Sequence, residues 1–172
     1  MGIKKIIALI MAIIVIIAIA TVIAIVCKKA LDKTTLQDLR TDMLLIQAKA
    51  KTYTENVNVE TANLDTAKEE DSTKIAEVKN EKLKGTVLEN CDENIKEAAR
   101  KAGIEDFADY YYLSQEDLNS MEISIEIEED TYYLVKYNFE DTEVVYTKGY
   151  EYNDKKYYKL SDMQTIEIEK NL

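Results

Sequence analysis

The chain of 172 residues carries a formal net charge of −11, which is distributed unevenly along its length. Residues 1–30 contain four lysines and no acidic residue, so residues 31–172 carry a net charge of −15. Such an acidic region repels phosphate backbones, which argues against a nucleic-acid partner. Histidine is absent, and with it the commonest general base near neutral pH and the commonest ligand of transition metals. Composition therefore disfavours nucleic-acid binding and the usual histidine-based sites.

The first clear pattern is a run of 21 uncharged residues from Ile6 to Val26, rich in Ile, Ala and Val. At about 1.5 Å per residue, a helix of this length crosses a hydrocarbon core of ~30 Å. The flanking pairs Lys4–Lys5 and Lys28–Lys29 can extend to the two interfaces. Residues 1–30 are therefore predicted to be a single-pass anchor in the lipid bilayer. The residues assigned to this anchor are Ile6, Ile10, Ile13, Ile17, Val22 and Val26.

An uncleaved anchor fits this segment better than a processed one. Val26 is bulky where a signal peptide or a lipoprotein needs a small residue before Cys27. Ile6 stands where N-myristoylation at Gly2 would need Ser or Thr. Lysine and arginine residues on the two sides are nearly balanced, so charge alone leaves the orientation open. We expect a cell-membrane protein whose C-terminal domain is extracellular.

Residues 31–57 are predicted to continue the helix as an amphipathic extension. Apolar residues recur there at alternating steps of three and four, which places them on one helical face. A two-stranded coiled coil would use the same spacing but normally needs more heptads. Packing of this helix on the chain's own domain is therefore favoured. The residues of the packing face are Leu36, Leu39, Met43, Ile46, Ala50 and Tyr53.

The next region, residues 58–91, is predicted to be a polar helix or loop. Glu, Lys, Asp, Asn and Thr dominate residues 54–84, which we expect to be solvated and weakly structured, and Gly85 ends this stretch.

Residues 92–172 are predicted to combine short helices with an antiparallel sheet. One helix is expected from Glu93 to about Ala102, with Asp92 as its N-cap and Gly103 as its stop. Ser114 and Asp117 predict the cap of a further single helical turn.

The last fifty residues have the pattern of β-strands. Ile123, Ile125 and Ile127 alternate with polar residues at period two, which predicts a half-buried strand. Polar residues 153–156 predict the turn of a hairpin. Further strands are expected at Tyr133–Phe139, Val144–Tyr146, Tyr150–Tyr152 and Tyr157–Leu160, and a short edge strand at Ile166 and Ile168. Short sequential connections favour an antiparallel meander with one face covered by the amphipathic helix, which makes the fold class α+β.

Few residue groups predict chemistry. The acidic runs Glu128–Asp130 and Glu140–Asp141 could offer oxygen ligands to calcium, but solvated turns are favoured because no loop with a fixed glycine is present. Serines have no histidine partner, which excludes a Ser-His-Asp nucleophile. Cys27 and Cys91 form no CxxC motif and are interpreted as inert thiols. We predict no catalysis, no cofactor and no metal.

Tyrosine is the unusual residue of the C-terminal region, with eleven copies from Tyr110 to Tyr158. Tyrosine packs well in strands, and its hydroxyl group can stay hydrated at a sheet edge. The same rings could instead stack on a sugar or a peptide. Packing is the favoured interpretation, and a binding face is the alternative. The residues of the possible binding face are Tyr132, Tyr150, Tyr152 and Tyr157.

This order of elements resembles the type IV pilins and pseudopilins of bacteria, in which a long N-terminal helix leaves the membrane and packs on a C-terminal antiparallel sheet. The stretch Leu39–Lys51 is similar to segments of pilin-like proteins, and so are Tyr132–Val135, Thr147–Gly149 and Lys156–Leu160. The likeness covers most of the chain as an architecture, through motifs of moderate specificity.

The chain departs from the pilin pattern at its N-terminus. Pilin precursors carry a glycine at the cleavage site, then an aliphatic or aromatic residue, and a glutamate four positions later. Here Lys4 and Lys5 follow Gly2-Ile3, and Ile7 stands where the glutamate would be. The prepilin cleavage motif is therefore not matched, which favours a minor or divergent subunit.

The resemblance implies a structural subunit or accessory component of a bacterial surface filament or secretion apparatus. Its expected partners are the lipid bilayer and other pilin-like subunits, contacted through the N-terminal helix. The alternative is a membrane-tethered extracellular binding module whose small-molecule ligand is unknown.

Overall fold

A computed structural model describes residues 35–138 and 140–167 of the chain. The chain divides into two compact units, Met1–Asp38 and Leu39–Leu172. The predicted anchor, residues 1–30, lies outside the described residues. Within residues 35–138 and 140–167, no helix combines the length and the apolar character that crossing a bilayer requires.

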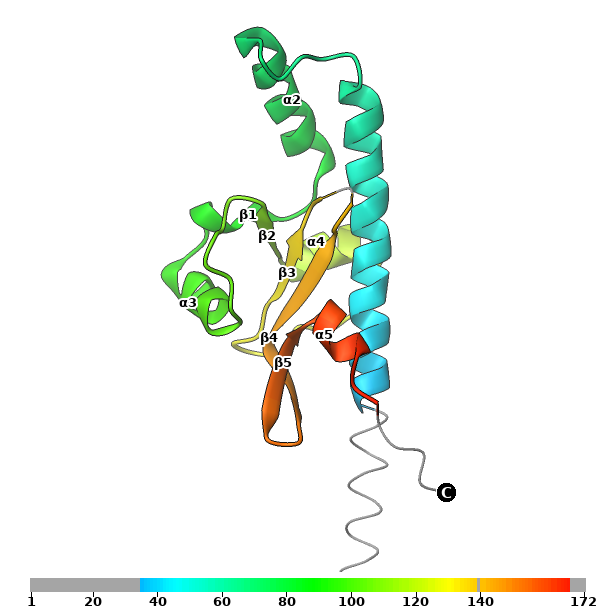
Figure 1. Cartoon of the computed structure of the whole chain (residues 1–172), viewed down its shortest axis with the longest axis vertical. Helices are drawn as coiled ribbons and strands as arrows, with labels where there is room; N and C mark the ends of the chain where they lie inside the picture. The colour runs from blue at the N-terminus through cyan, green and yellow to red at the C-terminus, as the bar shows by residue number, and fades with distance from the viewer. Residues whose placement is uncertain (1–34, 139, 168–172) are drawn as a thin grey trace, which may run out of the picture. The chain divides into compact units, whose positions relative to one another are not determined.

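The second unit has an α+β fold built on one five-stranded sheet (Figure 1). The strands are β1 (Thr86–Val87), β2 (Tyr110–Leu113), β3 (Tyr133–Lys136), β4 (Glu143–Tyr152) and β5 (Lys155–Lys159). They lie in chain order, and every neighbouring pair is antiparallel. The predicted antiparallel meander is therefore confirmed, with two strands, β1 and β2, that the sequence pattern did not reveal.

The described helices are arranged around this sheet. A helix covers residues 35–61 and is drawn in cyan without a label in Figure 1. The others are α2 (Glu69–Lys82), the 3-10 turn η1 (Leu88–Asn90), α3 (Glu93–Lys101), α4 (Gln115–Ser120) and α5 (Leu160–Gln164).

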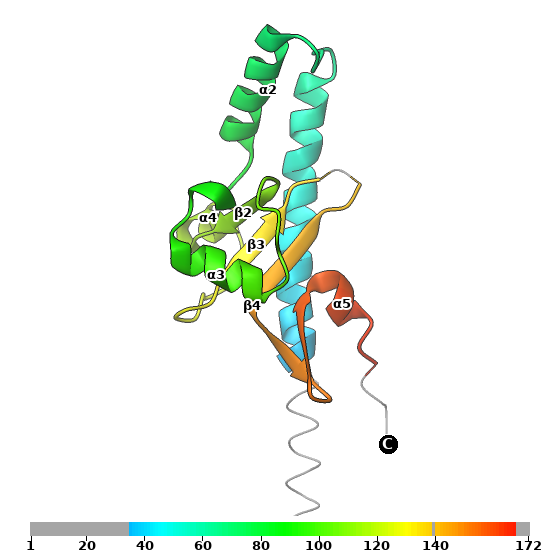
Figure 2. The same cartoon turned by 60° about the vertical axis from the view of Figure 1, so that its left-hand side comes forward.

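Helices cover both faces of the sheet, not one. In β3, Leu134 points into a cluster formed with η1 and α3, whereas Tyr133 and Val135 point to the opposite face because strand side chains alternate. Helix segment 39–61 lies along that opposite face, and α3 lies on the first (Figures 1 and 2). The first cluster contains Leu88, Ala99, Ala102, Ile104, Leu134 and Val145. The expectation of a single covered face was wrong because α3 supplies a second apolar surface.

Helix α2 is the helical alternative of the two predicted for residues 58–91, although a weakly structured stretch was expected over residues 54–84. None of its residues is buried, so packing does not explain why it is helical. Three acidic residues occupy its first turn and Lys79 and Lys82 its last, which complements the helix dipole. Lys74 also pairs with Glu70 one turn away, at 3.2 Å. The stretch is solvated as predicted, but its charges are arranged to favour a helix.

Helices α3 and α4 confirm two predictions from capping residues. Asp92 is the N-cap of α3 but makes no side-chain capping bond, and Gly103 follows the helix with a φ of +82°. In α4, the Ser114 backbone N–H donates to Asp117 Oδ2 at 2.9 Å, and the Asp117 N–H donates to Ser114 Oγ at 3.2 Å. This reciprocal pair is a capping box.

The predicted strand at Ile123–Ile127 is wrong. Ile123 and Ile125 are buried, 3% and 7% exposed, so the alternation of the side chains is real. The backbone nevertheless does not pair with the sheet, because the side-chain amide of Gln115 makes the hydrogen bonds that a neighbouring strand would make. Gln115 Nε2 donates to the Ile125 carbonyl at 2.7 Å, and its Oε1 accepts from the Ile127 N–H at 3.0 Å.

Strands β4 and β5 form the predicted hairpin. Its turn is Asn153–Asp154, and both residues have positive φ, as a two-residue type I′ turn requires. The strands expected at 144–146 and 150–152 are one strand, β4, with an irregularity between Val145 and Tyr150. Gly149 lies inside this irregularity with a φ of +68°.

The short edge strand predicted at Ile166 and Ile168 lies partly outside the described residues. Residues 160–164 form helix α5, and Ile166 follows it in irregular structure. Ile166 is buried, 6% exposed, so its apolar side chain contributes to the core without joining the sheet. Ile168 lies outside the described residues.

Candidate functional site

One face of the helix over residues 35–61 is buried. Of the six predicted packing residues, Leu36, Met43, Ile46 and Ala50 are fully buried, whereas Leu39 and Tyr53 are partly exposed. Thr54 and Val57 are buried in place of Tyr53. A repeat of 3.5 residues drifts around a straight helix of 3.6 residues per turn, so the buried face moves by one position towards the C-terminal end.

Polar side chains fix this helix against the domain at three positions along its length. The Arg40 guanidinium donates to the Met163 carbonyl, with Nε at 3.0 Å, and also to the Ile166 carbonyl at 2.7 Å. Gln47 Nε2 donates to the Thr142 carbonyl at 2.7 Å.

Nearer the C-terminal end of the helix, Lys49 Nζ forms an ion pair with Glu122 at 2.9 Å. Both partners are substantially exposed, so the arginine and glutamine bonds to buried carbonyls contribute more to the fixed position of the helix.

The outward face of the same helix carries apolar side chains in solvent. Leu44 is 43% exposed, Leu45 50% and Val59 73%, and these are the exposed large apolar residues of the described chain. Leu44 and Leu45 are adjacent to the exposed Ala48, one turn on, so they make a small apolar surface. We name Leu44, Leu45 and Ala48 the outer helix surface. Such a surface is suited to contact with another helix.

The four tyrosines of the predicted binding face do not lie together. Tyr132 faces the α3 side, where its ring meets Tyr112 edge-on with centroids 5.7 Å apart. Tyr150 and Tyr157 are directly opposite each other in the β4–β5 hairpin, and Tyr152 lies two residues further along. Tyr150 is only 8% exposed, whereas Tyr152 and Tyr157 are partly exposed. The structure therefore groups three of the four residues, two of them with accessible rings.

Other tyrosines belong to the core and are unsuited to acid–base chemistry. Burial raises the pKa of Tyr133 and of Tyr137 far above the usual value for tyrosine. The Tyr137 hydroxyl group donates to the Lys84 carbonyl at 2.9 Å and accepts from the Lys84 N–H at 3.3 Å. Tyr137 thus holds the connection between α2 and β1, which is a structural role.

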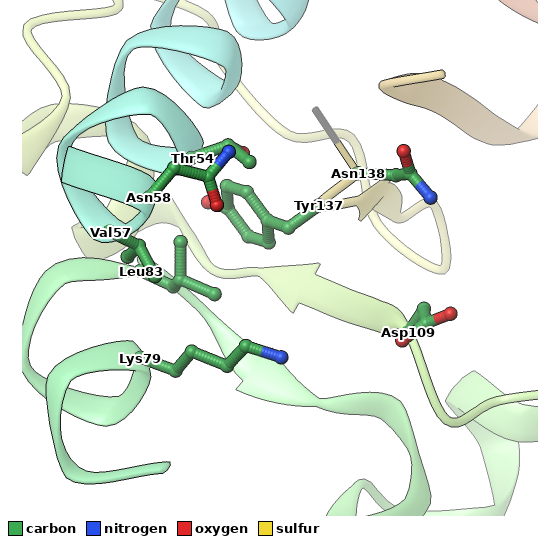
Figure 3. A pocket seen from close by; sticks show the side chains of 8 residues that line it. All are labelled: Thr54, Val57, Asn58, Lys79, Leu83, Asp109, Tyr137 and Asn138. Atoms are coloured by element: carbon green, nitrogen blue, oxygen red, sulfur yellow. The ribbon is translucent and has the colours of Figure 1, made fainter. Parts of the chain in front are cut away.

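A pocket of about 250 Å³ opens between helix 35–61, the C-terminal end of α2 and the edge formed by β2 and β3 (Figure 3). Val57, Leu83 and the ring of Tyr137 form an apolar wall, and the Lys79 side chain extends across the space towards Asp109 (Figure 3). The complete lining is Thr54, Val57, Asn58, Lys79, Leu83, Asp109, Tyr137 and Asn138. An apolar wall with one ammonium group, one carboxylate and side-chain amides suits a small zwitterion, whose carboxylate would face Lys79 and whose ammonium group would face Asp109.

Sequence reasoning missed this pocket. Its lining comes from four separate segments of the chain, and no local pattern distinguishes those residues from solvated polar ones. Lys79 was interpreted only as part of a charged stretch. Among the lining residues, only Val57 is marked by a sequence pattern, because it continues the apolar helix face one turn after Tyr53.

Titratable groups outside the pocket were considered as metal ligands and as nucleophiles. Within residues 35–138 and 140–167, no cluster of three or more Cys, Asp or Glu side chains is suited to a metal ion. Glu128, considered for calcium, pairs with Lys148. Burial raises the pKa of the Cys91 thiol, which lies 3.5 Å from the Val87 carbonyl. A thiol with a raised pKa is a poor nucleophile.

Comparison of the chain with protein-family models, with curated proteins and with solved structures found no match. The function proposed below therefore rests on the residues and geometry already described.

Proposed function

We propose that the chain is a pilin-like, membrane-anchored structural subunit or accessory component of a bacterial surface filament or secretion apparatus. The observation that carries the proposal is helix segment 39–61, which packs by one face on an antiparallel meander. In the sequence it follows the uncharged run Ile6–Val26 after only twelve residues. This combination of an apolar N-terminal run and a helix-backed meander is the architecture that the resemblance to pilins implies.

The outer helix surface supports an assembling subunit more than an isolated one. Leu44 and Leu45 expose apolar area on a helix whose other face is already fixed by Arg40 and Gln47. Burial of that area against a neighbouring subunit would stabilise an assembly at about 25 cal/mol per Å². Subunit contacts are therefore proposed along the whole helix, from the anchor to Ala48.

Assembly is tested in the native organism by two measurements. The first is co-purification of the chain with pilin-like proteins, and the second is recovery of the chain in sheared surface fractions. We expect Ile13→Asp and Ile17→Asp to abolish recovery, because an aspartate in the anchor opposes both insertion and helix contacts. Leu45→Asp should reduce assembly while leaving the protein in the membrane. The matched controls are Ile13→Leu and Lys51→Asp, the latter on an exposed position of the same helix.

Absence of the wild-type chain from sheared fractions, together with failure to co-purify with any pilin-like partner, would reject the proposal. Orientation is tested in intact cells with a membrane-impermeant maleimide directed at Cys91. Because Cys91 is partly buried, denatured cells give the full labelling value. Labelling that requires lysis but not denaturant would place the domain in the cytoplasm and remove the surface assignment.

A membrane-tethered binding module is a second candidate, favoured by the pocket beside Tyr137. Its ligand would be a small zwitterion whose carboxylate is met by Lys79 and whose ammonium group is met by Asp109. Amino acids and other small zwitterions can be screened by ligand-detected NMR on the full chain in micelles. Lys79→Ala should abolish a true signal, whereas Lys74→Ala, on the same helix but outside the pocket, should not. No saturable signal, or equal loss in both variants, would reject this candidate.

A further inference from the structure

The two ends of the second unit differ in charge. The turn of the β4–β5 hairpin lies at the same end of the unit as the start of helix segment 39–61 (Figures 1 and 2). The connection 62–68 and the start of α2 lie at the opposite end in both views. Residues 150–159 carry three lysines and two acidic residues, a net charge of +1, whereas residues 60–71 carry one lysine and five acidic residues, a net charge of −4.

The hairpin end is also the end that a membrane anchor would hold near the bilayer. Twelve residues separate Val26, the last residue of the uncharged run, from Leu39. They span about 18 Å as a helix and no more than about 43 Å when fully extended. Because the hairpin turn lies at the same end of the unit as the start of helix segment 39–61, an anchor in a membrane would tether this end of the unit and not the opposite one.

The side chains of the turn suit an anionic lipid surface. Lys155 and Lys156 are exposed, and Tyr152 and Tyr157 are partly exposed beside them. Lysines near a membrane are attracted to anionic headgroups, and tyrosine is enriched at the membrane–water interface. Residues 31–172 as a whole carry a net charge of −15 and would be repelled by the same headgroups, whereas hairpin residues 150–159 keep a net charge of +1 despite Glu151 and Asp154.

Contacts within the hairpin position its lysine side chains in the absence of lipid. Lys155 Nζ lies 4.9 Å from the centre of the Tyr157 ring, and Lys156 Nζ lies 5.7 Å from that of Tyr158. The Tyr152 hydroxyl group donates to the Glu167 carbonyl at 3.3 Å, which ties β4 to the segment after α5. Contacts of this kind favour positions of the two ammonium groups over the tyrosine rings, which lowers the conformational entropy lost on docking.

We propose that the turn of the β4–β5 hairpin docks on the anionic lipid surface of the bilayer that holds the anchor. This inference rests on the proposed function, because it requires Ile6–Val26 to be in a membrane. It gives the domain a preferred orientation towards the bilayer before assembly, with the acidic segment 60–71 facing away.

The test measures the proximity of the turn to headgroups in the full chain. Both native cysteines are replaced (Cys27→Ser, Cys91→Ser), and an NBD fluorophore is attached through Asn153→Cys or, as a distal control, through Ala67→Cys in connection 62–68. The protein is reconstituted into vesicles of phosphatidylcholine, with or without one third phosphatidylglycerol. Quenching is measured with a lipid that carries a nitroxide on its headgroup, and circular dichroism confirms that each variant is folded.

We expect at least threefold stronger quenching at Asn153→Cys than at Ala67→Cys in vesicles with phosphatidylglycerol. The difference should fall by at least half in pure phosphatidylcholine, in 0.5 M NaCl, and in the double variant Lys155→Gln/Lys156→Gln. The matched double variant Lys68→Gln/Lys74→Gln, near the distal end, should keep the difference in quenching between the two sites.

Equal quenching at the two sites in anionic vesicles would overturn the docking proposal and leave the anchor intact. Quenching that disappears when the protein is diluted within the vesicles would assign the lysines to the acidic surface of a neighbouring copy, which also overturns lipid docking. Failure of the chain to float with vesicles would reject the anchor itself, and the proposed function and this inference with it.

Discussion

Strand β3 and helix α2 are both regular elements of the same unit, but they are stabilised in different ways. In β3, Tyr133, Leu134 and Val135 are all buried because helices cover both faces of the sheet. In α2 no residue is buried, and charges at its two ends and along its exposed side favour the helix. Elements that bury apolar area open only with the whole domain, whereas exposed ones open locally at lower free energy. The unit therefore combines a cooperative sheet with a helix that can unfold on its own.

The largest expected effect comes from a cavity at the centre of the sheet. Leu134→Ala should lower the free energy of unfolding by about 2–5 kcal/mol, because Leu134 is fully buried against Val145 and the α3 cluster. The matched variant Ile75→Ala in α2 should cost less than about 1 kcal/mol, because Ile75 is only partly buried. Urea unfolding of the full chain in micelles, followed by tyrosine fluorescence, measures both. Similar losses would mean that α2 is part of the cooperative unit.

A smaller effect is expected at the irregularity of β4. Gly149→Ala should cost about 2–3 kcal/mol, because its φ of +68° is strained for alanine and its Cβ would lie 2.9 Å from the Tyr158 ring. Gly103→Ala provides the control, since its φ is +82° but no atom lies within 4 Å of the added Cβ. Only the backbone strain remains there, about 1 kcal/mol. Equal urea midpoints for the two variants would show that the Tyr158 ring moves aside freely.

The smallest effect on stability is expected at Tyr137, and it should distinguish local opening of α2 from global unfolding of the unit. Tyr137→Phe removes the hydroxyl group that bonds both backbone groups of Lys84, which should cost about 1 kcal/mol. Because Lys84 follows α2 directly, amide exchange in α2 should become faster while exchange in β3 changes by less. Tyr157→Phe is the control on the exposed hairpin. Acceleration of exchange in β3 equal to that in α2 would contradict a locally opening helix.

The fold was predictable where residue pattern and backbone bonding agree. The helix over residues 35–61 follows from its apolar spacing, and the hairpin follows from Asn153–Asp154 between tyrosine-rich strands. The capping box of Ser114 and Asp117 is a local signal and was also found. In each case the residues that make up the pattern lie within a few positions of one another, so the sequence displays the pattern directly.

Prediction failed where a distant partner decides the structure. Ile123–Ile127 has the alternation of a strand, but the Gln115 amide takes the bonds that a neighbouring strand would make. Tyr110–Leu113 is uniformly apolar because it lies between two covered faces, and this continuous pattern conceals strand β2. The pocket was not predictable either, since Lys79 and Asp109 are brought together only by the complete fold.

The bonds from Arg40 to Met163 and Ile166 also affect the synthesis of the chain. These partners are separated by 123 and 126 residues, so the first described helix cannot complete its packing until Met163 and Ile166 have been translated. At about 5–20 residues per second, the ribosome needs roughly 6–25 s to cover that distance. Until β3 and β4 have been translated, Met43, Ile46 and Ala50 have no sheet to cover them. A nascent chain of this protein would therefore present an apolar helix face to chaperones, and the domain would close only after α5 and Ile166 have been translated.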